Sequence, residues 1–162
     1  ELLKKLIAEQ IVVYKRTNVV KSERFSEIMQ RAMNQYLNGM LTNEEVIEEM
    51  MKLAKQIKEA GEEGKSLGLT ADELAFYDAL TKPQAIKDFY KNEELIAITK
   101  ELTETLRKNK TIDWQKKDSA RARMRMMIKR LLKTHKYPPD DQPEAIDAVM
   151  IQCELWADNL VE

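Results

Sequence analysis

The chain has 162 residues, of which 43% are hydrophobic and 34% are charged. Its 4 Gly and 4 Pro are too few for the many turns of an all-β protein, and good helix formers such as Leu, Ala, Glu, Lys and Met dominate instead. The formal net charge of −1 argues against a general binder of polyanions.

The first 40 residues predict two helices. Apolar residues recur at helical spacing from Leu2 to Tyr14, in a helix that should end near Thr17. A second apolar stripe runs from Phe25 onward, and we expect Gly39 to stop it because glycine adopts the left-handed conformation after a helix without steric cost.

The middle of the chain carries two T-x-x-E capping boxes, which begin helices by satisfying free backbone N–H groups. They are Thr42 with Glu45, and Thr70 with Glu73. The helix after the first box should fray through GEEGKSLG, residues 61–68. Further helical segments are expected at residues 71–80, 85–90 and 95–106.

The last third predicts a basic helix and an acidic helix. We expect Asp113 to cap the basic helix and Pro138 with Pro139 to end it, whereas Asp141 and Glu144 should begin the last helix. No segment of useful length alternates with period two. The chain is therefore predicted to be an all-α bundle of about seven or eight helices, forming one domain over residues 1–162.

No segment predicts a catalytic or metal site. GEEGKS, residues 61–66, resembles the end of a phosphate-binding loop, but Glu59 stands where its first Gly is needed and a helix precedes it instead of a strand. His135 lacks a ligand-type partner at helical spacing, which favours a surface histidine over a zinc ligand. Cys153 lies on an apolar stripe, which favours a buried thiol over a nucleophile.

Several features predict where the chain resides. A single cysteine excludes an internal disulfide and fits a reducing, cytoplasmic compartment. No apolar run approaches the roughly 20 residues of a membrane span, and the charged opening ELLKK is not a signal peptide. The absence of an initiator Met suggests a piece of a longer protein.

The segment TIDWQKKDSARARMRMMIKR, residues 111–130, raises the main functional question. At 100° per residue its helix has one broad apolar stripe, made of Trp114, Ala120, Met124, Met127, Ile128, Leu131 and Leu132. The opposite side carries the candidate residues for contact with a partner or DNA, around an exposed Met126: Arg123, Lys129, Arg130 and Lys133. These two sides predict one core face and one binding face.

Arg121 falls on the apolar side of this helix, and Arg125 flanks it. An arginine there needs a carboxylate or carbonyl partner, because burying its charge alone is costly. We therefore expect both to form structural ion pairs inside the bundle. An exposed site that faces a partner is the alternative.

The charges of the last two helices are complementary. Residues 111–136 hold nine Lys or Arg against two Asp or Glu, whereas residues 137–162 hold seven Asp or Glu and no Lys or Arg. The acidic segment is therefore a candidate to neutralise the charge of the basic helix within the chain. This favours internal pairing over a grip on DNA phosphates, which stays open as the alternative.

Four segments carry a family resemblance: LTADELAFYDAL (69–80), LRKNKTIDW (106–114), RARMRMMIKRLLKTHKYPPD (121–140) and QPEAIDAVMIQCELWAD (142–158). They resemble the C-terminal helical region of the restriction subunit of type I restriction enzymes. The similarity runs over residues 42–162, while residues 1–40 read as generic leading helices. His135 and Lys136 stand where the family more often has Tyr-Gly, a departure that affects only a loop.

The resemblance implies a large parent subunit with a nuclease domain and two helicase-type motor domains that use ATP and Mg. That subunit would bind a methyltransferase core of modification and specificity subunits and translocate DNA. This chain has neither a nuclease motif nor a usable phosphate loop, so the resemblance implies a non-catalytic, cofactor-free assembly domain. Its expected partners are the methyltransferase core and the chain's own motor domains, with weak contact to duplex DNA and none to a membrane. The rival readings are a DNA-binding module and a plain scaffold for the motor domains.

Overall fold

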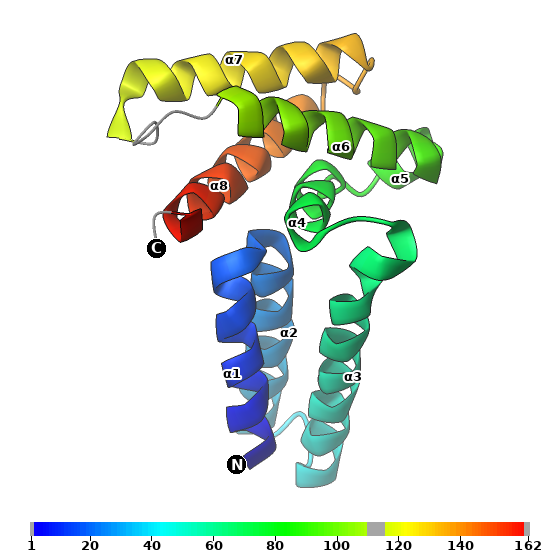
Figure 1. The fold of residues 1–162 in the computed structure, drawn as a ribbon. Helices are drawn as coiled ribbons and strands as arrows, with labels where there is room; N and C mark the ends of the chain where they lie inside the picture. The colour runs from blue at the N-terminus through cyan, green and yellow to red at the C-terminus, as the bar shows by residue number, and fades with distance from the viewer. Residues whose placement is uncertain (1, 110–115, 161–162) are drawn as a thin grey trace. The chain divides into compact units, whose positions relative to one another are not determined.

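The fold is known from a computed structural model that describes residues 2–109 and 116–160, without the side chains of 157–160. Within these ranges it contains eight helices and no strand (Figure 1), which confirms the all-α prediction. The helices are α1 (Leu2–Thr17), α2 (Val19–Leu37), α3 (Asn43–Leu67), α4 (Ala71–Leu80), α5 (Ile86–Phe89), α6 (Asn92–Asn109), α7 (Asp118–Thr134) and α8 (Gln142–Leu160). None of the described helices is long and apolar enough to cross a membrane. The expected Asp113 cap and Trp114 lie outside the described residues.

The chain divides into two compact units, which we call unit 1 (Glu1–Gly68) and unit 2 (Leu69–Glu162). Unit 1 holds α1 to α3 and unit 2 holds α4 to α8. That residues 1–162 behave as a single domain stays a prediction.

Unit 1 is a three-helix bundle. Asn18 separates α1 from α2 and caps α2, because its side chain accepts a hydrogen bond from the backbone N–H of Lys21. Tyr14 packs edge-to-face on Phe25, with ring centroids 5.4 Å apart. The buried core draws on all three helices: Ile7, Ile11, Phe25, Ala32, Met50, Leu53, Ile57 and Ala60.

Helix α3 is longer than its sequence suggested. Its capping box is formed by Thr42 and Glu45 as predicted, but the expected fraying through residues 61–68 is wrong, since the helix continues to Leu67. Glu63 in this last stretch accepts a hydrogen bond from the Lys21 ammonium at 2.7 Å, and Gly64 is buried. The helix ends at Gly68, which has the left-handed φ of 72° that glycine tolerates.

Unit 2 is built around α4, whose residues from Leu74 to Leu80 are all buried. Helix α4 packs on α6 and α8, and α7 packs on α8 and α6. The predicted capping box of Thr70 and Glu73 begins α4. A helix that is buried on every side has a nearly continuous run of apolar residues, and residues 74–80, LAFYDAL, come close to such a run.

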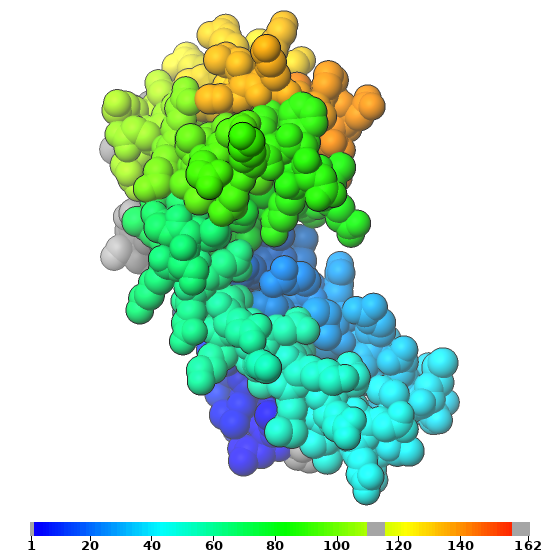
Figure 2. All heavy atoms as spheres, turned by 90° about the vertical axis from the view of Figure 1, so that its right-hand side faces the viewer, coloured from blue at the N-terminus to red at the C-terminus, as the bar shows by residue number. Residues whose placement is uncertain are grey.

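The turn after α7 is fixed by hydrogen bonds to other elements of unit 2. The Tyr90 hydroxyl donates to the His135 carbonyl at 2.7 Å, and the Tyr137 hydroxyl donates to the Leu80 carbonyl at 2.6 Å. His135 Nε2 also lies 2.6 Å from Glu101 Oε2 on α6. Figure 2 shows this turn, in orange, beside the green atoms of α5 and α6.

Candidate docking surface on helix α7

Helix α7 has the inner face that its sequence predicts. Met124, Ile128, Leu131 and Leu132 are buried against the rest of unit 2, and Ala120 and Met127 are half-buried. Trp114, the remaining member of the predicted stripe, lies outside the described residues. The inner face therefore belongs to the core, and functional contacts have to come from other sides of the helix.

One flank of α7 is joined to α8 by ion pairs. The Arg121 guanidinium contacts the Glu154 carboxylate, and Arg125 Nη1 lies 3.0 Å from Asp147 Oδ1. Neither pair is deeply buried, since the Arg121 and Glu154 side chains are 41% and 30% exposed and those of Arg125 and Asp147 are 52% and 62% exposed. Water therefore screens both attractions, the second more than the first.

The outer face of α7 carries the four cations singled out from the sequence: Arg123, Lys129, Arg130 and Lys133. All four side chains are exposed, and none forms an ion pair with a described residue. At 100° per residue they span an arc of about 120° on the helix, with Met126 at its middle. Met126 is itself 52% exposed.

The acidic helix α8 thus balances a flank of α7 and not its outer face. Asp147 and Glu154 engage Arg125 and Arg121, whereas the four outer cations have no carboxylate partner among the described residues. The neutralisation of the basic helix that we expected from the sequence is therefore only partial. What remains is an exposed basic surface around one methionine, which we call the α7 outer face.

The described residues include the histidine and the cysteine that were considered as a metal ligand and a nucleophile. No group of three or more His, Cys, Asp or Glu side chains that could hold a metal occurs among them. Cys153 is buried, as its place on the apolar stripe predicts. His135 is partly exposed at the end of α7, where its Nε2 lies beside the Glu101 carboxylate.

Comparison with known proteins identifies the family of this chain. A family described as "Type I restriction enzyme HindI endonuclease subunit-like, C-terminal" matches residues 1–159. The chain is 43% identical over 158 residues to the type I restriction enzyme HindI endonuclease subunit of Haemophilus influenzae, covering 98% of this chain and 15% of that protein. It is 37% identical over 134 residues to the putative type I restriction enzyme MjaIXP endonuclease subunit of Methanocaldococcus jannaschii, covering 82% of this chain and 13% of that protein.

No solved structure matches the chain well enough to count as a relative. The chain spans only about a seventh of the length of the two relatives that it matches. The family match includes residues 1–40, so the leading helices are also part of the region that the relatives share. The chain therefore belongs to the family of type I restriction enzyme endonuclease subunits, as a member of their C-terminal region.

Proposed function

We propose that this chain is a non-catalytic assembly domain of a type I restriction enzyme. It would dock a DNA-translocating, ATP-dependent endonuclease subunit onto the methyltransferase core of modification and specificity subunits during cytoplasmic restriction of foreign DNA. The observation that carries the proposal is the α7 outer face, which leaves four cations and Met126 without a partner among the described residues.

The composition of this face favours a protein partner. Its two arginines and Met126 are of residue types enriched in protein interfaces, whereas its two lysines are of a depleted type. A methionine at the centre of the patch gains from burial against apolar side chains. A DNA backbone would use the four cations but would offer little to Met126, because phosphate contacts are electrostatic. The matching surface on the partner should therefore be acidic, with an apolar depression for Met126.

The test measures two affinities of the chain in parallel. Binding to the purified methyltransferase core of the same system and to labelled duplex DNA is followed for the unchanged chain, Lys129→Glu with Arg130→Glu, and Met126→Ser. We expect docking to weaken at least about tenfold in both variants, since each removes part of a central contact. Lys55→Glu with Lys58→Glu, which reverses two exposed lysines of α3 in unit 1, is the matched control.

Duplex DNA should bind only in the non-specific range, with a Kd on the order of 10⁻⁵ M or weaker near physiological salt. A DNA-binding module, the second candidate, would give a different pattern. Its affinity would be sub-micromolar, would be abolished by the Lys129 and Arg130 reversal, would ignore Met126→Ser, and would fall with salt by about 0.9 log units per phosphate contact. That pattern, with docking to the methyltransferase core intact, would overturn the proposal.

A further inference from the structure

Unit 1 carries a shallow groove between α1 and α2, far in sequence from α7. Helix α1 supplies one wall through Lys4, Ala8, Val12 and Lys15, and α2 supplies the other through residues that include Met29 and Met33. The groove has a volume of about 370 Å³. These four α1 residues are spaced by four, four and three positions, which places them along one side of the helix.

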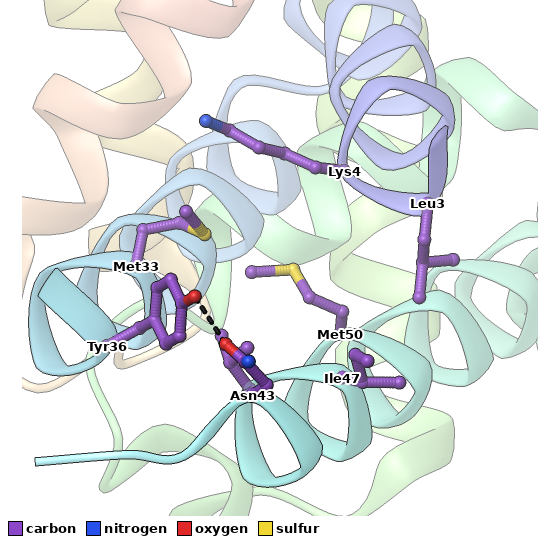
Figure 3. A pocket seen from close by; sticks show the side chains of 8 residues that line it. Leu3, Lys4, Met33, Tyr36, Asn43, Ile47 and Met50 are labelled. Atoms are coloured by element: carbon purple, nitrogen blue, oxygen red, sulfur yellow. Dashed lines mark hydrogen bonds between the residues drawn. The ribbon is translucent and has the colours of Figure 1, made fainter. Parts of the chain in front are cut away.

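The groove continues into a second hollow where α1, α2 and α3 meet. This hollow has a volume of about 280 Å³ and shares Lys4 and Met33 with the first. Figure 3 shows side chains from all three helices around it, with the Met33 and Met50 side chains directed into the space. The Tyr36 hydroxyl, hydrogen-bonded to Asn43 of α3, closes one side.

The charges that line the groove are all positive. Lys4 and Lys15 are the charged residues among those around the first hollow, and Lys4 is the charged residue around the second. The two lysines lie 11 positions apart on α1, a distance of about 16 Å at 1.5 Å per residue. The other residues that line the first hollow are mainly aliphatic and methionine side chains, among which Val12 is exposed and Ile11 is buried.

We propose that this groove binds an amphipathic helix of another protein. The helix would be about three turns long, with its apolar face on Val12 and the two α2 methionines and a carboxylate at each end for Lys4 and Lys15. Three turns of helix span about 16 Å, which matches the separation of the lysines. Grooves between helices commonly receive such helices, and methionines adapt to the side chains that enter. The inference does not depend on the α7 outer face.

The experiment uses the full chain and two labelled helical peptides of about 15 residues. Both are alanine-based with leucines on one face, and they carry two glutamates or two lysines on that face at the spacing of Lys4 and Lys15. We expect the glutamate peptide to bind about tenfold more tightly than the lysine peptide, since each end adds one rim ion pair. Lys4→Glu with Lys15→Glu should invert this preference, and Val12→Gln should weaken both peptides.

Lys55→Glu with Lys58→Glu, outside the groove, should leave the preference unchanged, and helical circular dichroism checks that each variant is folded. Absence of saturable binding by either peptide would overturn the proposal. So would a preference that survives the Lys4 and Lys15 reversal. Self-association of the chain that Val12→Gln disrupts would also overturn it, by assigning the groove to a second copy.

Discussion

The ion pair between Lys21 and Glu63 gives the sharpest test of how unit 1 is stabilised. Lys21 Nζ lies 2.7 Å from Glu63 Oε2, and the Lys21 side chain is only 1% exposed while that of Glu63 is 33% exposed. Glu63→Gln keeps the shape but removes the negative charge from a buried ammonium. Breaking a fully buried pair costs about 3–5 kcal/mol. Because Glu63 is a third exposed, we expect a loss of about 2 kcal/mol, roughly a 30-fold fall in the ratio of folded to unfolded chain.

Adding Lys21→Met to Glu63→Gln distinguishes the cost of a buried charge without its partner from the cost of losing the contact itself. In the double variant, methionine at position 21 keeps the apolar stem without the ammonium and glutamine at position 63 removes the carboxylate, so neither member of this pair keeps its charge. Replacing a buried ion pair by apolar groups of similar volume is often neutral or stabilising. Lys21→Met with Glu63→Gln should therefore be within about 1 kcal/mol of the unchanged chain, and more stable than Glu63→Gln alone.

The assay is urea unfolding followed by two probes. Circular dichroism follows the helices of both units, whereas both tryptophans, Trp114 and Trp156, belong to unit 2. Glu63→Gln should shift the circular dichroism transition to lower urea concentration, and a tryptophan transition that stays in place would show that the two units unfold separately. Lys52 and Glu49, an exposed pair in the same unit, give the control: Glu49→Gln should cost less than about 0.5 kcal/mol. An equally small loss for Glu63→Gln would refute the reasoning.

Three further predictions concern unit 2 and the chain as a whole. Arg121→Ala should cost about 1 kcal/mol by tryptophan fluorescence, below the value for a buried pair, because Arg121 is 41% exposed. Burial raises the pKa of Tyr137 above its ordinary value of about 10. The stabilisation from its neutral form is therefore present below pH 10 and lost as pH rises through the folded-state pKa. Unfolding curves of Tyr137→Phe should show a smaller decrease in the free energy of unfolding at alkaline pH. A clean preparation of the chain should show neither ATP turnover nor DNA cleavage, and activity that follows the chain through purification would contradict the proposed non-catalytic role.

Local sequence signals predicted most of the fold. The two capping boxes and the apolar faces are short-range patterns, and the structure confirms them at α3, α4 and α7. The prediction of a frayed helix end at residues 61–68 was wrong. Three glycines and several charges favour fraying locally, but contacts with residues distant in the sequence keep this segment helical. The partner of Glu63 is Lys21, 42 positions earlier in the chain. No periodicity connects two residues that distant, so their pairing could not be predicted.

The groove of unit 1 was also not predicted from the spacing of residues in the sequence. Lys4, Ala8, Val12 and Lys15 have helical spacing, but they lie beside the core stripe of α1 and not in it. Whether such a side faces solvent, another helix or a groove depends on where α2 packs. The sequence could therefore predict the helix and its buried face, but not the hollow between two helices.

Summed charge along the chain is a poor guide to the potential of the α7 outer face. The sequence has an excess of basic residues in 111–136 and seven acidic residues in 137–162. In the structure, however, the paired carboxylates lie on the flank of α7 that contacts α8. A helix with its side chains is about 10 Å across, while the Debye length at physiological salt is about 8 Å. Carboxylates on the flank thus neutralise little of the outer face in the cell. We expect docking to weaken as salt rises and then to level off, because burial of Met126 is not screened. Docking lost entirely at high salt would mean that the four cations act alone.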